Sequence, residues 1–115
     1  KLHLEDLEEK LRTLPFRLAM TSLPDAILGE ALVLLGEASP SARELCKDKG
    51  EDLLLNVEVL PSAPLFSLLR THLSPHCVPK RAFLVESIPT TETGKPARAR
   101  IRDLVMRLSS DCRRE

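Results

Sequence analysis

A lysine at the end of a turn-forming loop is the side chain of this sequence best suited to chemistry. Lys95 closes the run Thr-Thr-Glu-Thr-Gly-Lys at positions 90–95. Its ammonium group is a compact positive charge on a long, mobile stem, which suits it to meet negative charge developing on phosphate or carboxylate oxygens. Gly94 allows the backbone to approach a ligand closely, and the threonines offer hydroxyl groups. Without further context, a lysine in such a loop is usually a solvated turn residue.

These residues do not form a phosphate-binding loop of the Walker A type. That motif requires a glycine five residues before Gly94 and a serine or threonine directly after the lysine. Both positions, 89 and 96, are proline in this sequence. Any nucleotide chemistry at Lys95 must therefore use a different loop geometry.

The histidines and cysteines give no sign of a metal site. His72 and His76 have the spacing of a helical metal pair, but Ser74-Pro75 lies between them and interrupts a helix. The three cysteines, at positions 46, 77 and 112, are widely spaced and form no C-x-x-C motif. We expect neither a zinc site nor a disulfide framework, and three free thiols fit the reducing cytoplasm.

The composition excludes several classes of partner. The chain has 115 residues, the length of one domain, and its 17 basic residues balance 17 acidic ones. Trp and Tyr are absent, and no apolar run is long enough to span a bilayer. We therefore expect no nucleic-acid partner and no membrane association. Because the sequence begins at Lys1 without an initiator Met, we also expect it to be a piece of a longer protein.

Hydrophobic periodicity predicts alternating helices and strands. Helices are expected at 3–14, at 42–47 after Pro40, from an N-cap at Ser62 to residue 73, and at 97–109. Strands are expected at 16–23, at 30–35 with both faces buried, at 53–59 with alternate residues on one face, and at 82–86. This order predicts an α+β fold in which helices pack against a small sheet.

Three motifs, taken in order, resemble those of a known enzyme superfamily. The first, Lys1–Glu8, is similar to K-I-x-P-x-E-I-E, and the second, Pro24–Val33, is similar to pD-x-x-x-G-E-x-v. The third comprises Val78-Pro79, the strand Ala82–Glu86, Ile88-Pro89, Thr93-Gly94-Lys95 and Arg98. Together they resemble the C-terminal lid domain of the adenylate-forming (ANL) superfamily, which includes acyl-CoA synthetases, adenylation domains of peptide synthetases, and luciferases.

The resemblance implies a role for each matching residue. Lys95 would be the adenylation lysine, with Thr93, Gly94 and Arg98 near the nucleotide or substrate. Asp25, Gly29 and Glu30 would form a loop of the lid. The enzyme would be an AMP-forming carboxylate–CoA ligase that uses ATP, CoA and a carboxylic acid, and Mg²⁺ would be held mainly by a large N-terminal domain. After adenylation the lid would rotate, so that residues 1–8 and 16–23 would help to line the pantetheine tunnel. The isolated domain is expected to be inactive.

The sequence also departs from the family pattern and leaves alternatives open. Ala97 stands where the family often has an acidic residue, and residues 36–62 form a long connection. The compact lysine motif is similar to that of the o-succinylbenzoate-CoA ligases of menaquinone synthesis. A lid of an adenylation domain that loads a carrier protein is the first alternative. A non-catalytic α+β binding module is the second.

Overall fold

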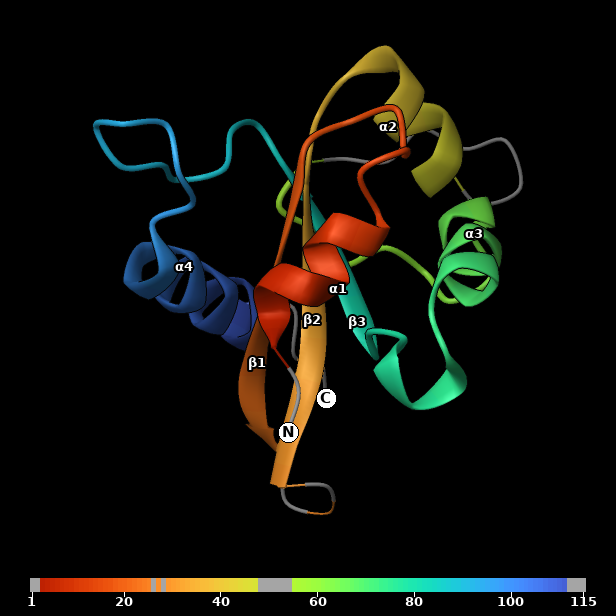
Figure 1. Cartoon of the computed structure of the whole chain (residues 1–115), viewed down its shortest axis with the longest axis horizontal. Helices are drawn as coiled ribbons and strands as arrows, with labels where there is room; N and C mark the ends of the chain where they lie inside the picture. The colour runs from red at the N-terminus through yellow and green to blue at the C-terminus, as the bar shows by residue number, and fades with distance from the viewer. Residues whose placement is uncertain (1–2, 26, 28, 48–54, 112–115) are drawn as a thin grey trace.

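The computed structural model describes residues 3–25, 27, 29–47 and 55–111. Within these ranges the chain forms helices and one three-stranded sheet (Figure 1). The α-helices are α1 (Leu4–Lys10), α2 (Pro40–Cys46), α3 (Pro64–His72) and α4 (Arg98–Asp111), and a 3-10 turn, η1, covers Pro75–Cys77. The strands are β1 (Leu18–Asp25), β2 (Gly29–Glu37) and β3 (Arg81–Val85). No helix of the described part has the length and apolar character needed to cross a membrane.

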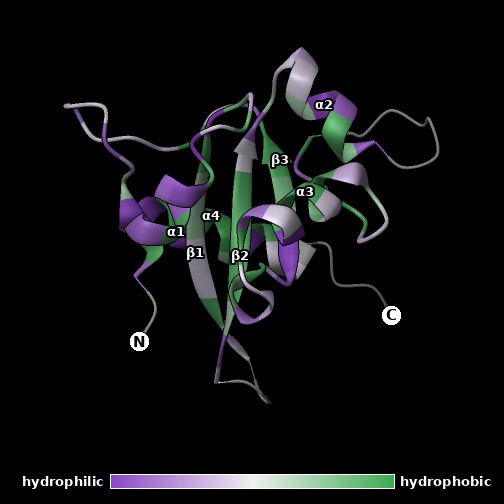
Figure 2. Cartoon of the chain, turned by 45° about the vertical axis from the view of Figure 1, so that its right-hand side comes forward, coloured by the Kyte–Doolittle hydropathy of each residue, from purple (hydrophilic) through white to green (hydrophobic). Residues whose placement is uncertain are grey.

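Strand β2 is the centre of the sheet. β1 runs antiparallel to it, with Met20 opposite Leu34, and β3 runs parallel to it, with Phe83 opposite Leu35. The side chains at 33–35 are completely buried because helices cover both faces of the sheet. The predicted strand at 30–35 is therefore confirmed, although Glu30 at its beginning is exposed. Strands β2 and β3 are the mainly hydrophobic ribbons in Figure 2.

Alternating side chains divide the interior into two hydrophobic cores, one on each face of the sheet. Val33, Leu35 and Phe83 pack against α4, whereas Met20 and Leu34 pack on the opposite face. The helical residues buried on the α4 side are Ile101, Val105 and Leu108, and those on the other side include Leu7, Leu65, Phe66 and Leu69. The predicted α+β fold, with helices against a small sheet, is confirmed.

Several predicted elements differ from the structure at their ends. Helix α1 ends at Lys10 rather than residue 14, because Leu11 and Arg12 donate backbone hydrogen bonds three residues back and tighten the chain into turns. Helix α3 is capped by Ala63 rather than the predicted Ser62. Pro64, with its fixed φ angle, takes the first helical position, so the residue directly before it becomes the cap. Strand β1 runs two residues later than predicted and includes Pro24, which an edge strand tolerates.

The predicted strand at 53–59 is wrong for the part that the structure describes, and residues 53 and 54 lie outside that part. Asn56 has a φ angle of 65°, a left-handed conformation that interrupts an extended strand. Val59 is buried, but Val57 is 40% exposed, so the two do not share a buried face. The segment is connected to β3 by an isolated bridge from Glu58 to Phe83 and by backbone hydrogen bonds from the N–H groups of Asn56 and Val59 to β3 carbonyls, each 2.8 Å, rather than by a regular strand ladder.

An arginine at the start of β3 fastens this segment to the sheet. Arg81 donates two hydrogen bonds to the Glu58 carboxylate, at 2.9 and 2.7 Å, and one to the Ser109 hydroxyl on α4 at 2.5 Å. Its guanidinium also lies 5.3 Å from the ring centre of Phe83. One side chain thus joins the 55–59 segment, β3 and α4, which keeps the irregular segment in place without a regular strand.

Candidate functional site

The Lys95 loop is a short β-hairpin that follows β3. The Thr91 N–H donates to the Lys95 carbonyl at 2.7 Å, and the Gly94 N–H donates to the Thr91 carbonyl at 2.9 Å. This is the pattern of a three-residue hairpin loop closed by a residue in the left-handed region. Gly94 has a φ angle of 87°, and a side chain there would meet no atom within 4 Å. The backbone conformation, rather than a lack of space, therefore requires glycine.

The backbone of Lys95 is held, whereas its ammonium group is not. The Lys95 N–H donates to the Thr91 hydroxyl at 3.2 Å, and that hydroxyl lies 3.0 Å from the hydroxyl of Thr93. The Lys95 side chain is exposed, and its ammonium makes no hydrogen bond or ion pair with the residues that the structure describes. The hairpin thus carries an exposed cation that is unpaired within the described residues, on a loop that extends away from the sheet (Figure 1).

Arg98, three residues after Lys95, has its partner inside the domain. Its guanidinium donates to both carboxylate oxygens of Glu8, each at 2.7 Å, and to the carbonyl of Met20 at 3.3 Å. The hydrogen bond to Glu8 raises the pKa of Arg98. Arg98 is therefore close to Lys95 in the sequence, but in the structure its charge is directed toward α1. A role of Arg98 in nucleotide binding stays a prediction.

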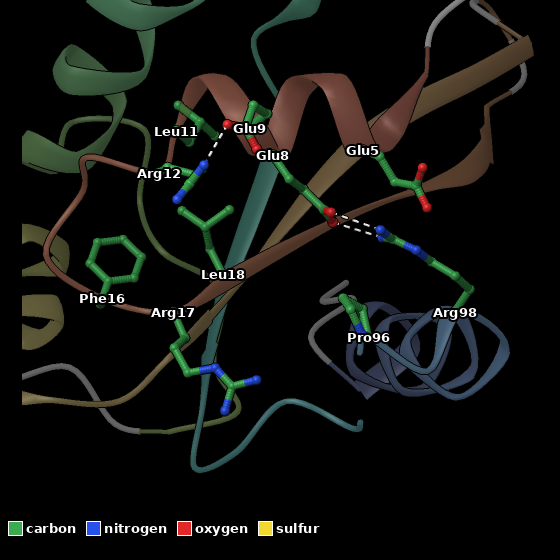
Figure 3. A pocket seen from close by; sticks show the side chains of 10 residues that line it. All are labelled: Glu5, Glu8, Glu9, Leu11, Arg12, Phe16, Arg17, Leu18, Pro96 and Arg98. Carbon is green, nitrogen blue, oxygen red and sulfur yellow. Dashed lines mark hydrogen bonds and ion pairs between the residues drawn. The ribbon is translucent and has the colours of Figure 1, made fainter. Parts of the chain in front are cut away.

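A hollow of about 430 Å³ lies between α1, the start of β1 and the end of the hairpin (Figure 3). Its charged lining residues are Glu5, Glu8, Glu9, Arg12, Arg17 and Arg98. Glu9 and Arg12 pair with each other at 2.7 Å, while the guanidinium of Arg17 has no hydrogen bond or ion pair within the described part of the chain. Sequence reasoning missed this hollow. Leu4, Leu7 and Leu11 recur at helical spacing in the sequence and mark the side of α1 that faces the core, so its acidic residues had to lie on the outer side.

Asp25, Gly29 and Glu30 lie at the opposite end of the sheet from the Lys95 hairpin (Figure 1). Asp25 ends β1 opposite Gly29, which begins β2 with a φ angle of 83°. The Glu30 carboxylate accepts a hydrogen bond of 2.5 Å from Ser22 and lies 4.0 Å from Arg102. The structure does not bring these three predicted residues together with Lys95, Thr93 and Gly94. Their predicted role in a lid loop stays a prediction.

The described residues contain no group of three His, Cys, Asp or Glu side chains that could hold a metal ion. His72 is the last residue of α3 and His76 lies in η1, so the two do not share a helix, as predicted. His72 instead contacts the Thr13 hydroxyl at 3.3 Å and the Leu68 carbonyl at 3.0 Å. These contacts make it part of the packing between α3 and the α1–β1 connection.

The buried thiol of Cys46 predicts a loss of stability in alkali. Cys46 is 2% exposed, and burial raises its pKa from an ordinary value of 9.0 to about 11. Between these two pH values the unfolded thiol loses its proton while the folded one keeps it, so rising pH favours unfolding. We expect the free energy of unfolding to fall by about 3 kcal/mol across this window from Cys46 alone. Urea denaturation at several pH values, with Cys46→Ala as the control, measures it. Equal pH slopes for both proteins would contradict the prediction.

Comparison with solved structures finds enzymes of related architecture. An amide bond synthetase, McbA from Marinactinospora thermotolerans, is 29% identical with a TM-score of 0.62, over 89% of this chain and 18% of its own. A fatty acyl CoA synthetase from Mycobacterium tuberculosis is 20% identical with a TM-score of 0.60, over 84% of this chain and 16% of its own. An AMP-forming acyl-CoA synthetase-like protein from Dyadobacter fermentans is 18% identical with a TM-score of 0.61, over 93% of this chain and 27% of its own.

This chain therefore spans about a fifth of the length of the solved structures that it matches. The similarity extends over 84–93% of this chain. No family model and no curated protein matches the sequence.

Proposed function

We propose that this chain is the C-terminal domain of an AMP-forming ligase that activates a carboxylic acid with ATP. The observation that carries the proposal is the unpaired ammonium of Lys95 on a hairpin whose backbone is fixed by hydrogen bonds. The three sequence motifs and the structural likeness to acyl-CoA synthetases and an amide bond synthetase support it. A larger N-terminal domain would bind ATP, the acid and Mg²⁺. The described part of this chain offers no side-chain cluster for the metal.

In the first half-reaction a carboxylate oxygen attacks the α-phosphorus of ATP. A new P–O bond forms, the bond to the leaving pyrophosphate breaks, and the product is an acyl-adenylate. Negative charge shifts between the attacking carboxylate, the α-phosphate oxygens and the leaving group during this step. An ammonium group placed between them stabilises the transition state more than the ground state, which is the role we propose for Lys95. Gly94 and Thr93 would allow the hairpin to approach the nucleotide closely.

In the second half-reaction a nucleophile attacks the acyl carbon and AMP leaves. We propose that the domain rotates between the two steps, because the predicted lid residues Asp25, Gly29 and Glu30 lie at the other end of the sheet from Lys95. The rotation would withdraw the lysine and present α1 and β1 toward the acceptor. Domain closure and rotation of this kind are common gating devices.

The acceptor is CoA in our first proposal and an amine in the second. CoA follows from the resemblance of the motifs and from the acyl-CoA synthetases among the similar structures. An amine is favoured by the amide bond synthetase, which at 29% identity is nearer in sequence than those synthetases at 18–20%. A third possible acceptor is the thiol of a carrier protein, which the same domain would receive. The acid is proposed to be o-succinylbenzoate, which the lysine motif suggests.

One experiment separates these acceptors. The full-length protein would be incubated with ATP, Mg²⁺ and a panel of acids that includes o-succinylbenzoate, and acid-dependent exchange of labelled pyrophosphate into ATP would be measured. We expect exchange with at least one acid, and the acyl-adenylate formed would then be offered CoA, a set of amines, or a carrier protein. Thioester formation with release of AMP supports the CoA ligase, whereas amide formation supports the second proposal. Absence of exchange with every acid would leave a non-catalytic binding module as the better description.

A further inference from the structure

The ion pair between Glu8 and Arg98 connects the first helix of the domain to the last. The two residues are 90 positions apart in the sequence, and the two N–H···O bonds between them form a parallel, bidentate pair (Figure 3). The carboxylate of Glu8 also accepts the N–H of Met20 at 2.7 Å. Glu8 therefore joins α1, β1 and α4 through one side chain, and bidentate pairs of this kind fix orientation as well as distance.

This pair differs from the other ion pair of the same helix. The Glu8 side chain is only 15% exposed and that of Arg98 is 35% exposed. Glu9 and Arg12 are 64% and 72% exposed and lie on one turn of chain. Exposed pairs contribute little because water and salt screen them, whereas a part-buried pair with several donors holds its geometry. Of these two pairs, the Glu8–Arg98 pair is the one that fixes one element relative to another.

The hairpin is attached directly to the point that this pair holds. Arg98 is the first residue of α4, and only Pro96 and Ala97 separate it from Lys95. The Ala97 N–H donates to the Pro89 carbonyl at 3.0 Å, and the Ala97 carbonyl accepts the N–H of Ile101 at 2.9 Å. Ala97 is therefore hydrogen-bonded both to the residue before the hairpin and to α4, which couples the direction of the hairpin to that of α4.

We propose that Glu8 is a positioning residue that, through Arg98, fixes where the hairpin holds Lys95 during adenylation. The proposal rests on the proposed function of Lys95. It assigns Arg98 to the support of the lysine rather than to the nucleotide, because recruiting Arg98 to a phosphate would leave the largely buried carboxylate of Glu8 without its cation.

The test uses the full-length protein with Glu8→Gln, which keeps the shape of the side chain and removes its charge. Glu9→Gln is the matched control, because it breaks the exposed pair on the same helix. We expect Glu8→Gln to lower kcat for pyrophosphate exchange by about tenfold to a hundredfold, as small misplacements of a catalytic group do. KM for ATP should be unchanged. Arg98→Lys keeps the charge but loses the bidentate geometry. Its kcat for pyrophosphate exchange should lie between those of Glu8→Gln and the wild type.

Two further measurements distinguish a role of Glu8 in positioning Lys95 from a role in stabilising the fold alone. In a Lys95→Ala background, Glu8→Gln should lower the exchange rate no further, because the group that it positions is already absent. Hydrogen exchange of the backbone amides of Thr91, Gly94 and Lys95 should be faster in Glu8→Gln than in Glu9→Gln. A full additional loss in the double variant, or a lower Tm with unchanged kcat, would overturn the proposal.

The same measurements distinguish failure of this inference from failure of the proposed function. If Lys95→Ala leaves pyrophosphate exchange unchanged, the adenylation role of the lysine is wrong, and a positioning role in that step is overturned with it. If Lys95→Ala abolishes exchange but Glu8→Gln changes neither kcat nor the amide exchange of the hairpin, the proposed function stands and the role of Glu8 is wrong.

Discussion

Replacing Lys95 with alanine is expected to lower acid-dependent pyrophosphate exchange by the full-length protein about a hundredfold or more. The loss of one preorganised charge aimed at the developing negative charge of a transition state removes about 3 kcal/mol of stabilisation, and each 1.4 kcal/mol is a factor of ten in rate. Because the ammonium makes no bond within the described part of the domain, its removal should not disturb the fold. The reaction of preformed acyl-adenylate with its acceptor should survive.

Lys80→Ala is the matched control for this experiment. Lys80 is also an exposed lysine, but it lies just before β3, at the end of the sheet opposite the hairpin, and its backbone N–H bond to Leu32 survives substitution. We expect exchange to stay within about twofold of wild type, since surface substitutions away from a site have small effects. Equal rates for Lys95→Ala and the wild type would show that Lys95 is an ordinary turn residue and that the adenylation role is wrong.

Replacing Phe83 with alanine is expected to reduce the free energy of unfolding of this chain by about 3–5 kcal/mol. Phe83 is 1% exposed in the core between the sheet and α4, and its ring also lies beneath the guanidinium of Arg81. The substitution removes buried apolar surface, leaves a cavity and takes away the aromatic face. Urea denaturation of the 115-residue chain measures the change.

Two milder substitutions make this test quantitative. Phe83→Leu keeps most of the volume and should reduce the free energy of unfolding by about 1 kcal/mol, so the chain stays folded even if the alanine variant does not. Leu60→Ala removes an apolar side chain that is 50% exposed and should have little effect. A loss below about 1 kcal/mol for Phe83→Ala would contradict the two-core description of the fold.

Local sequence patterns predicted the regular elements well where the burial of apolar side chains determined the structure. The mainly apolar residues 30–35 were predicted as a strand buried on both faces and form part of the central strand β2. The helical spacing from Ile101 to Leu108 was predicted as one side of a helix and forms the buried face of α4. The alternation at 53–59 was misleading because alternation says nothing about backbone conformation. Asn56, a residue that tolerates the left-handed region, was the signal that this segment turns instead.

The candidate site was predictable in its local part and not in its long-range part. Threonine, glycine and proline around Lys95 indicated a tight turn, and the hairpin confirms the turn. The partner of Arg98 is 90 residues away, and no spacing rule along the chain can identify it. In the sequence, Glu8 is the last residue of the first motif and one of four acidic residues between positions 5 and 9. Its selection from among them depends on how α1 packs across β1, which is a property of the folded chain.

The Glu8–Arg98 pair also affects whether two molecules of this protein can associate through the edges of their sheets. Strand β1 is the edge of the sheet, and an unpaired strand edge can recruit the edge of another molecule and start aggregation. At Met20 both backbone groups are already occupied, the N–H by the carboxylate of Glu8 and the carbonyl by the guanidinium of Arg98. Pro24, farther along the same strand, has no N–H to offer. The contact that orients the hairpin thus also blunts the sheet edge against intermolecular strand pairing.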